Sequence, residues 1–181
     1  MAESDYHIEL VRQCIQNDRK AQEQLYKQFL GPMWSICVRY IQQREEALEA
    51  LNDGYLKIFQ HIATYDPARS ALITWMSRIM IHTAIDCLRR KKSLHYIPVE
   101  ETSIEEETYS DDLPDRYTTE ELLFYIHQLP EQTKLVFNLY TIEGYTHEEI
   151  AGFLGISGST SRWHVTEARK RLQKMIHNHG R

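Results

Sequence analysis

The chain has 181 residues, of which 42% are hydrophobic and 26% are charged. This composition suits one ordinary domain or two very small ones, and it excludes a chain that is disordered throughout. No apolar stretch approaches the roughly 18 residues that a membrane-spanning helix needs, so we expect no membrane insertion. The acidic N-terminus is followed by no apolar run, so no signal peptide is predicted and a cytoplasmic protein is expected.

The net charge of −5 is unevenly distributed. Residues 1–92 carry 13 basic and 11 acidic side chains, residues 93–117 carry one and eight, and residues 118–181 carry seven of each. The whole acidic excess therefore lies in the middle segment, whereas basic residues gather at 89–92 and near the C-terminus. For this reason the negative total does not argue against nucleic-acid binding.

The sequence offers little that favours an enzyme or a metalloprotein. Cys14, Cys37 and Cys87 are far apart among apolar residues, which predicts buried, reduced thiols. None of them has the close Cys/His spacing of a metal site. A glycine-rich phosphate loop, an HExxH motif and a nucleophile elbow are also missing from the sequence. We therefore expect no catalytic residues, no metal and no cofactor.

In the first half, apolar residues recur three and four apart, which predicts helices rather than strands. The Gly31–Pro32 pair predicts a break or kink, because proline removes a helical hydrogen bond. The run Tyr65-Asp66-Pro67 ends the third helical pattern. In that pattern we expect Leu48 to share a buried face with Leu51, Tyr55 and Ile58. The predicted helices cover about Tyr6–Gln16, Lys20–Tyr40, Glu45–Ile62 and Ala71–Lys92.

Residues 93–117 lose all periodicity, and acidic residues, Thr, Ser and prolines dominate them, which predicts a linker that charge repulsion extends. Helical spacing resumes at Thr118, with one apolar stripe ending at Pro130 and another ending before Gly144. The sequence thus predicts an all-α protein of two small helical domains, residues 1–92 and 118–181, joined by an acidic linker over residues 93–117.

The second domain carries a predicted helix-turn-helix. Thr146 and Glu149 have the spacing of a capping box, Gly155 supplies the turn, and Ser157 caps a last helix that reaches about Met175. Such a pair of helices is typical of duplex DNA readers, although a plain helical hairpin has the same outline. Side chains of the last helix that we expect to face outward toward bases or phosphates are Ser159, Ser161, Arg162, Trp163, Thr166, Glu167 and Lys170.

Two segments carry a resemblance to a known family. The first half contains REEALEALNDGYLKIFQHIATYDPARSALITWMSRIMIHTAIDCLRRKKS, and the second contains LPEQTKLVFNLYTIEGYTHEEIAGFLGIS followed by GSTSRWHVTEARKRLQ. These segments resemble regions 2 and 4 of the extracytoplasmic-function (ECF) group of bacterial RNA polymerase sigma factors. The resemblance covers nearly the whole chain. It implies an alternative sigma factor that binds core polymerase, directs it to specific promoters and helps to melt the minus-ten element.

Further roles follow from this resemblance. The partners it implies are promoter DNA and the polymerase core, through the largest-subunit clamp helices and the flap, and it admits an anti-sigma factor. Region 4 would read the minus-thirty-five element. The acidic linker would thread toward the active-site cleft, and a solubilising tether is the alternative. The helix that would dock on the clamp helices carries the polymerase-binding candidates Asn52, Asp53, Leu56, Lys57 and Phe59.

In the same family, the loop corresponding to Ala63–Ala71 captures a base flipped out of the minus-ten element, and the next helix holds the separated strand. A pocket for an unstacked base needs an aromatic ring and polar edges, which this loop offers. Trp75 belongs either to that region or to the core. The minus-ten candidates are Tyr65, Asp66, Arg69, Ser70, Arg78, His82, Arg89 and Arg90.

The sequence departs from the usual family pattern at Trp163 and Glu167, which leaves the promoter bases open. An alternative function is a stand-alone helix-turn-helix regulator that binds duplex DNA without polymerase. Such regulators usually carry a ligand-binding or dimerisation domain beside the helix-turn-helix. Here the first half instead offers a basic helix and a loop suited to single-stranded DNA, which favours the sigma factor.

Overall fold

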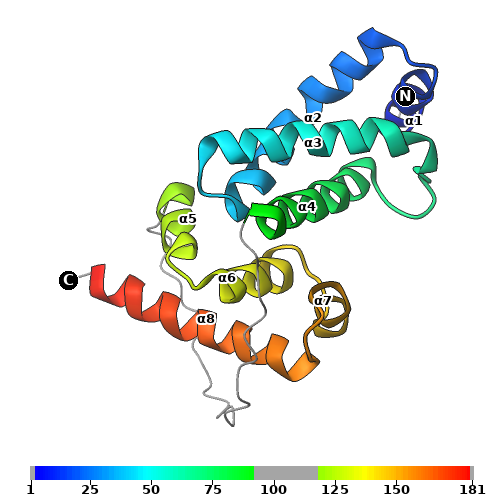
Figure 1. The fold of residues 1–181 in the computed structure, drawn as a ribbon. Helices are drawn as coiled ribbons and strands as arrows, with labels where there is room; N and C mark the ends of the chain where they lie inside the picture. Colours follow the sequence, from blue (N-terminus) through cyan, green and yellow to red (C-terminus); the bar gives the residue numbers. More distant parts are fainter. Residues whose placement is uncertain (1–2, 92–117, 180–181) are drawn as a thin grey trace. The chain divides into compact units, whose positions relative to one another are not determined.

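The computed structural model describes residues 3–91 and 118–179, and within these ranges all regular secondary structure is helical (Figure 1). The predicted all-α class is confirmed. The chain divides into two compact units, residues 1–95 and 96–181. The predicted acidic linker, residues 93–117, lies outside the described residues.

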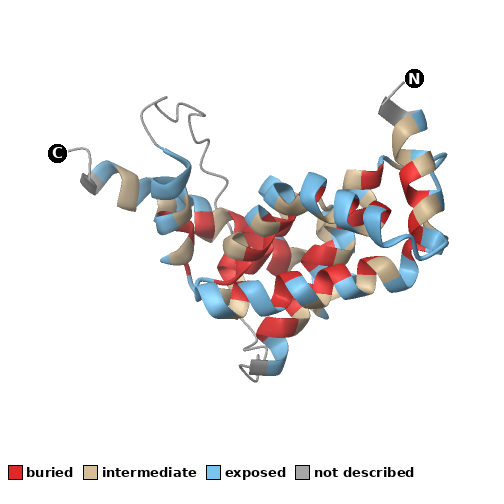
Figure 2. Ribbon diagram, turned by 90° about the horizontal axis from the view of Figure 1, so that it is seen from above, coloured by how far each residue is buried: buried red, intermediate tan, exposed pale blue. Residues whose placement is uncertain are grey.

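The described part of the first unit is a helical bundle formed by α1 (Glu3–Ile15), α2 (Arg19–Tyr40), α3 (Arg44–His61) and α4 (Leu72–Lys91). A short 3-10 turn, η1 (Ile62–Thr64), follows α3. Helices α2, α3 and α4 all pack against one another, and α1 packs on α2. Figure 2 shows the result, with buried residues along one side of the helices and exposed residues along the other. Fully buried side chains include Leu25, Met33, Tyr40, Ile58, Met76, Met80 and Ile85.

Of the break or kink predicted at Gly31–Pro32, the break is absent, because α2 runs without interruption through Pro32. Proline removes one backbone hydrogen bond from the helix interior. Phe29 and Met33 are buried on either side of it, so tertiary packing holds both halves of α2 in one helix. The predicted buried thiols are confirmed as well, and burial raises the pKa of Cys14 to about 11.

The described part of the second unit contains α5 (Thr119–His127), α6 (Glu131–Phe137), α7 (His147–Leu154) and α8 (Gly158–His179). A π-helical segment, η2 (Asn138–Ile142), continues α6 and was not predicted. The long helix α8 packs against α6, α7 and α5. Its inner face therefore builds much of the core, which includes Ile126, Leu129, Phe137 and Ala168 with Leu172 and Met175 at its edge.

Gly54 explains how closely α3 and α4 approach. A Cβ added at this position would lie 2.4 Å from Met80 Sδ and 2.6 Å from Met80 Cε. Met80 is completely buried, so its thioether end has little room to move aside. The glycine that weakens the propensity of α3 therefore makes space for the side chain of the neighbouring helix.

We expect Gly54→Ala to lower the free energy of unfolding of the first unit by about 1 to 3 kcal/mol, because it overpacks the contact with Met80. The measurement is urea unfolding of the purified chain. Gly152→Ala is the control, because nothing lies within 4 Å of a Cβ added there. That variant is expected to gain up to about 1 kcal/mol from helix propensity. An equal gain at both positions would contradict the packing argument.

Candidate nucleic-acid interface

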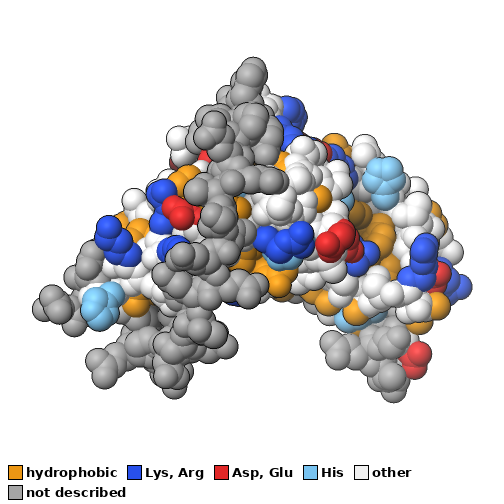
Figure 3. All heavy atoms as spheres, turned by 90° about the horizontal axis from the view of Figure 1, so that it is seen from below, with side chains coloured by type: hydrophobic (Ala, Val, Ile, Leu, Met, Phe, Trp, Pro, Cys, Tyr) orange, Lys and Arg blue, Asp and Glu red, His pale blue; other side chains and the backbone are white. Residues whose placement is uncertain are grey.

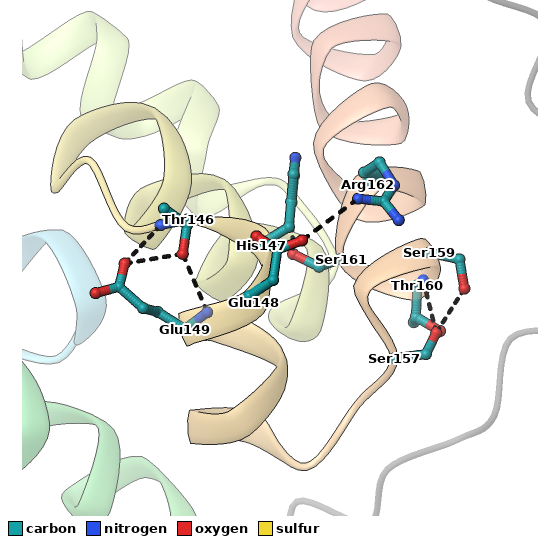
Figure 4. A network of polar contacts seen from close by, with 9 residues as sticks. All are labelled: Thr146, His147, Glu148, Glu149, Ser157, Ser159, Thr160, Ser161 and Arg162. Carbon is teal, nitrogen blue, oxygen red and sulfur yellow. Dashed lines mark hydrogen bonds and ion pairs between the residues drawn. The ribbon is translucent and has the colours of Figure 1, made fainter.

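The helix-turn-helix forms as predicted, through local hydrogen bonds (Figure 4). The backbone N–H of Thr146 donates to Glu149 Oε2 at 2.9 Å, and the N–H of Glu149 donates to Thr146 Oγ1 at 3.2 Å. Gly155 ends α7 in the left-handed conformation, with φ of 70°, which glycine adopts without strain. The N–H of Thr160 donates to Ser157 Oγ at 3.0 Å, so Ser157 caps the start of α8.

The inner face of α8 carries two polar side chains that bind neighbouring elements. Ser161 Oγ lies 2.9 Å from Nδ1 of His147, the first residue of α7. His164 Nδ1 lies 3.0 Å from Oγ1 of Thr133 on α6. Ser161 is completely buried, so its predicted outward orientation is wrong. Its position three and seven residues before His164 and Ala168 places it on the packed side of the helix.

The outer face of α8 is basic and open to solvent. The Arg162 side chain is 54% exposed and lies 3.9 Å, Nη1 to Oε1, from Glu148 at the start of α7. Lys170 is exposed, Trp163 is half-buried with its ring edge-on to His164, and Ser159 contacts Ser157. Thr166 donates to the carbonyl of Arg162, and Glu167 forms an ion pair with Arg171. Arg162 and Lys170 are thus the predicted residues best placed for phosphates or bases.

In the first unit, the loop between η1 and α4 is ordered around Tyr65. Its hydroxyl donates to the carbonyl of Ser70 at 3.2 Å, and its ring lies 5.7 Å from that of Trp75. The carboxylate of Asp66 accepts the N–H of Ala68 at 2.9 Å, an Asx turn. Arg69 remains exposed. The structure therefore brings Tyr65, Asp66, Arg69 and Ser70 together in one loop, with Tyr65 packed against Trp75.

Helix α4 presents a basic outer face beyond this loop. Arg78, His82 and Arg89 are all exposed, and their spacing of four and seven residues places them on one side of the helix. Burial lowers the pKa of His82, Asp86 raises it, and the charges of Lys57, Arg78 and Arg89 lower it further. The charges of Lys57, Arg78 and Arg89 thus all act on His82. A group of cations of this kind suits a phosphate backbone.

Two ion pairs join α3 to α4. Arg90 Nη2 lies 3.1 Å from Asp53 Oδ2, and Lys57 Nζ lies 3.6 Å from Asp86 Oδ2. In Figure 3, which shows one face of the molecule, basic side chains lie at separate places and several have an acidic side chain beside them. Asp53 and Lys57 were predicted to face polymerase and Arg90 to face DNA. In the structure, Asp53 and Arg90 pair with each other, and Lys57 pairs with Asp86.

The remaining outer face of α3 is partly apolar. Leu56 is 58% exposed and Asn52 is exposed, whereas Phe59 is half-buried near Tyr55. Leu48 is 49% exposed, so its predicted place on the buried face is wrong. It lies four and eight residues before Asn52 and Leu56 and extends their exposed stripe. The sequence contains this spacing, but it does not show whether Leu48 belongs to the exposed stripe or to the buried face of Leu51.

Comparison with known proteins finds a family match in each of the two units. Residues 25–94 match the family described as Sigma-70 region 2, and residues 119–172 match Sigma-70, region 4. The chain is 26% identical to the ECF RNA polymerase sigma-E factor of Haemophilus influenzae, over 97% of this chain and 98% of that protein. It is 24% identical to the ECF RNA polymerase sigma factor SigM of Mycobacterium tuberculosis, over 94% and 84%.

The chain belongs to the sigma-70 family, in its ECF group. Members of this family are transcription initiation factors. The fold agrees with that of a solved sigma factor, RpoE of Bartonella quintana in complex with the anti-sigma factor NepR. The TM-score is 0.54 at 16% identity, over 85% of this chain and 95% of that one.

The predicted contact residues of this sigma factor divide between the two matched regions. The minus-ten and polymerase candidates fall within region 2, and the minus-thirty-five candidates fall within region 4. Their individual contacts stay predictions. None of the helices within residues 3–91 and 118–179 is long and apolar enough to cross a membrane. Over the same residues, no group of three or more His, Cys, Asp or Glu side chains is arranged to hold a metal ion.

The buried His164 makes the stability of region 4 depend on pH. Burial lowers the pKa of His164, although Glu167 raises it. The unfolded chain therefore binds more protons than the folded chain below the ordinary histidine pKa of about 6.5. We expect the unfolding midpoint of region 4 to fall as the pH falls from about 7 toward about 5, followed through amide NMR signals of α8.

The control for this prediction is His164→Gln, which keeps a polar partner for Thr133 but does not titrate. Its unfolding midpoint is expected to depend less on pH than that of the unmodified chain. The same pH dependence in both proteins would mean that other groups cause the effect.

Proposed function

We propose that this sigma factor binds the RNA polymerase core, brings it to specific promoters and helps to melt the minus-ten element. The observation that carries the proposal is that one chain holds two basic surfaces of different design. Region 4 offers a helix-turn-helix with a basic outer face, which suits duplex DNA. Region 2 offers an aromatic loop next to a basic helix face, which suits an unstacked base and its strand. The proposal assigns no catalytic step to the chain.

At the minus-thirty-five element, we assign the direct contacts to the outer side of α8. Arg162 and Lys170 supply charge for phosphates or guanine edges, and Trp163 supplies an apolar surface. Ser159 and Thr166 lie beside them as polar contacts. Ser161 acts indirectly, because it is buried against His147. Glu167 is held by Arg171, so we give it a minor part in reading bases.

At the minus-ten element, we assign the base pocket to the loop of Tyr65, Asp66, Arg69 and Ser70. Tyr65 and Trp75 form a tilted aromatic pair at its inner side. The outer face of α4, with Arg78, His82 and Arg89, then continues from the loop as a track for the single strand. A helix that served only to build the core would not need these exposed basic side chains on its outer face.

For polymerase, we assign the exposed stripe of α3, formed by Leu48, Asn52 and Leu56 with Phe59 at its end. Exposed leucines at helical spacing on a polar surface are typical of a docking face. Asp53 and Lys57 border it and are joined to α4 by ion pairs. We also propose that an anti-sigma factor regulates this chain, because the RpoE structure of similar fold holds one. We further propose that the chain acts in the cytoplasm.

The test of the proposal is transcription by a reconstituted holoenzyme. The full chain is mixed with core polymerase and genomic DNA, and the 5′ ends of the transcripts are sequenced. We expect the chain to co-purify with core and to direct initiation at a set of promoters that share two elements. A stand-alone regulator would bind duplex DNA without core and would add no start sites, which would overturn the proposal.

A second prediction concerns promoter opening. We expect Tyr65→Ala to slow opening by roughly five- to 150-fold, because the loss of base stacking costs about 1 to 3 kcal/mol. Tyr65→Phe is the control, because it keeps the ring against Trp75 and loses only the hydrogen bond to Ser70. The measurement is permanganate reactivity of minus-ten thymines in the holoenzyme complex. Equal opening by all three proteins would argue against the base pocket.

A further inference from the structure

His147 lies where α7 meets α8, among the polar side chains of Glu148, Ser161 and Arg162 (Figure 4). It is the first residue of α7, where helix N–H groups concentrate positive potential. The charges of Arg162 and Arg169 on α8 act on its ring, as does that of Glu148 beside it. Sequence reasoning singled out none of this, because a lone histidine in a capping box has no distinctive pattern.

Two contacts fix the orientation of the His147 ring. Its plane stacks on Tyr140 of η2, with centroids 4.2 Å apart and 13° between the planes. Its Nδ1 lies 2.9 Å from Oγ of Ser161, which is completely buried. The Nδ1 side of the ring therefore faces the interior of the helix-turn-helix. His147 as a whole is half-buried, and with Nδ1 against Ser161, Nε2 is the ring nitrogen that we assign to a partner outside the chain.

We propose that His147 contacts a phosphate of the bound duplex and makes this contact as the imidazolium. This inference rests on the proposed function, since it requires that the helix-turn-helix bind duplex DNA. In the imidazolium both ring nitrogens carry hydrogen. Nδ1 donates to Ser161 Oγ, and Nε2 donates to a phosphate oxygen. The proton comes from solvent, so DNA binding takes up one proton.

The surrounding charges explain why the proton arrives with DNA. In the free protein, burial and the charge of Arg162 lower the pKa of His147, Glu148 raises it, and Arg169 lowers it again. The groups that face the ring are thus Arg162 and Arg169 from α8, Glu148 from α7 and Tyr140 from η2. A phosphate at Nε2 offsets the two arginines. The bound state then favours the charged ring, and the free state favours the neutral one.

This arrangement fixes the sign and the limit of the effect. A group that gains a proton on binding makes affinity rise as the pH falls, by at most about tenfold per pH unit. Protonation of the buried His164 has the opposite sign, because it destabilises region 4 and weakens binding. The direction of the pH dependence therefore tells the two histidines apart.

The experiment uses holoenzyme reconstituted from the full chain and core, on a duplex that carries a promoter mapped by transcript sequencing. The dissociation constant is measured at constant ionic strength between about pH 7.5 and about pH 6.5, above the lowered pKa of the free His147, so that most of the free protein holds a neutral ring. The unmodified protein is expected to bind several-fold more tightly at the lower pH. Two variants remove the proton: His147→Phe keeps the stacking on Tyr140, and His147→Gln keeps a polar partner for Ser161.

Both variants are expected to lose the pH-dependent gain, and the slope of log affinity against log salt is expected to fall by about 0.9. His177→Gln is the control, because His177 is exposed near the end of α8, and it should change neither quantity. If the variants bind more weakly but keep the pH dependence, His147 is only structural and the inference is wrong. If the holoenzyme initiates at no promoter, the proposed function itself fails.

Discussion

The fold of region 4 depends on two hydrogen bonds that fix the rotation of α8 about its own axis. Thr133 pairs with His164, and His147 pairs with Ser161, so that α6 and α7 each hold one polar group of the buried face. A buried polar group that loses its partner destabilises the fold, so each pair excludes other rotations of α8. Successive helical residues differ by about 100°, and a shift of one position would bury Arg162 or expose Ala168. The basic face points outward because the polar pairs of the inner face allow only one rotation of α8.

The same pairs bring titratable groups into the core of a DNA-binding unit. A leucine at position 164 would pack without any response to pH. A histidine that must remain neutral when buried links the fold to the proton concentration. His147 adds a second link at the boundary between core and surface, where burial and the nearby arginines lower the pKa of the ring and the proposed phosphate would raise it. Region 4 thus has an inner histidine that favours high pH and an outer one that favours low pH when DNA is present.

What the sequence predicted well is local. The capping box of Thr146 and Glu149, the turn at Gly155 and the cap at Ser157 depend on residues a few positions apart, and all three are present. Features that depend on distant partners were missed. The sequence predicts Ser161 at the surface because its partner, His147, lies on another helix, and it predicts Leu48 in the core because it shares an apolar pattern with the buried Leu51. The continuity of α2 through Pro32 likewise depends on packing from α3 and α4.

The ion pairs between α3 and α4 show the same limit in region 2, with a consequence for function. Asp53 and Lys57 lie on the helix assigned to polymerase, yet their partners Arg90 and Asp86 lie on the helix assigned to DNA. All four side chains are substantially exposed, so solvent screens the pairs and they add little to stability. Each pair nonetheless joins a charge on the proposed polymerase surface of α3 to a charge on the proposed DNA surface of α4. An Asp53 variant that alters polymerase binding also frees Arg90, and only a double-mutant cycle with Arg90 separates the two effects. The polymerase and promoter contacts proposed for region 2 therefore share side chains that form ion pairs with one another in the free chain.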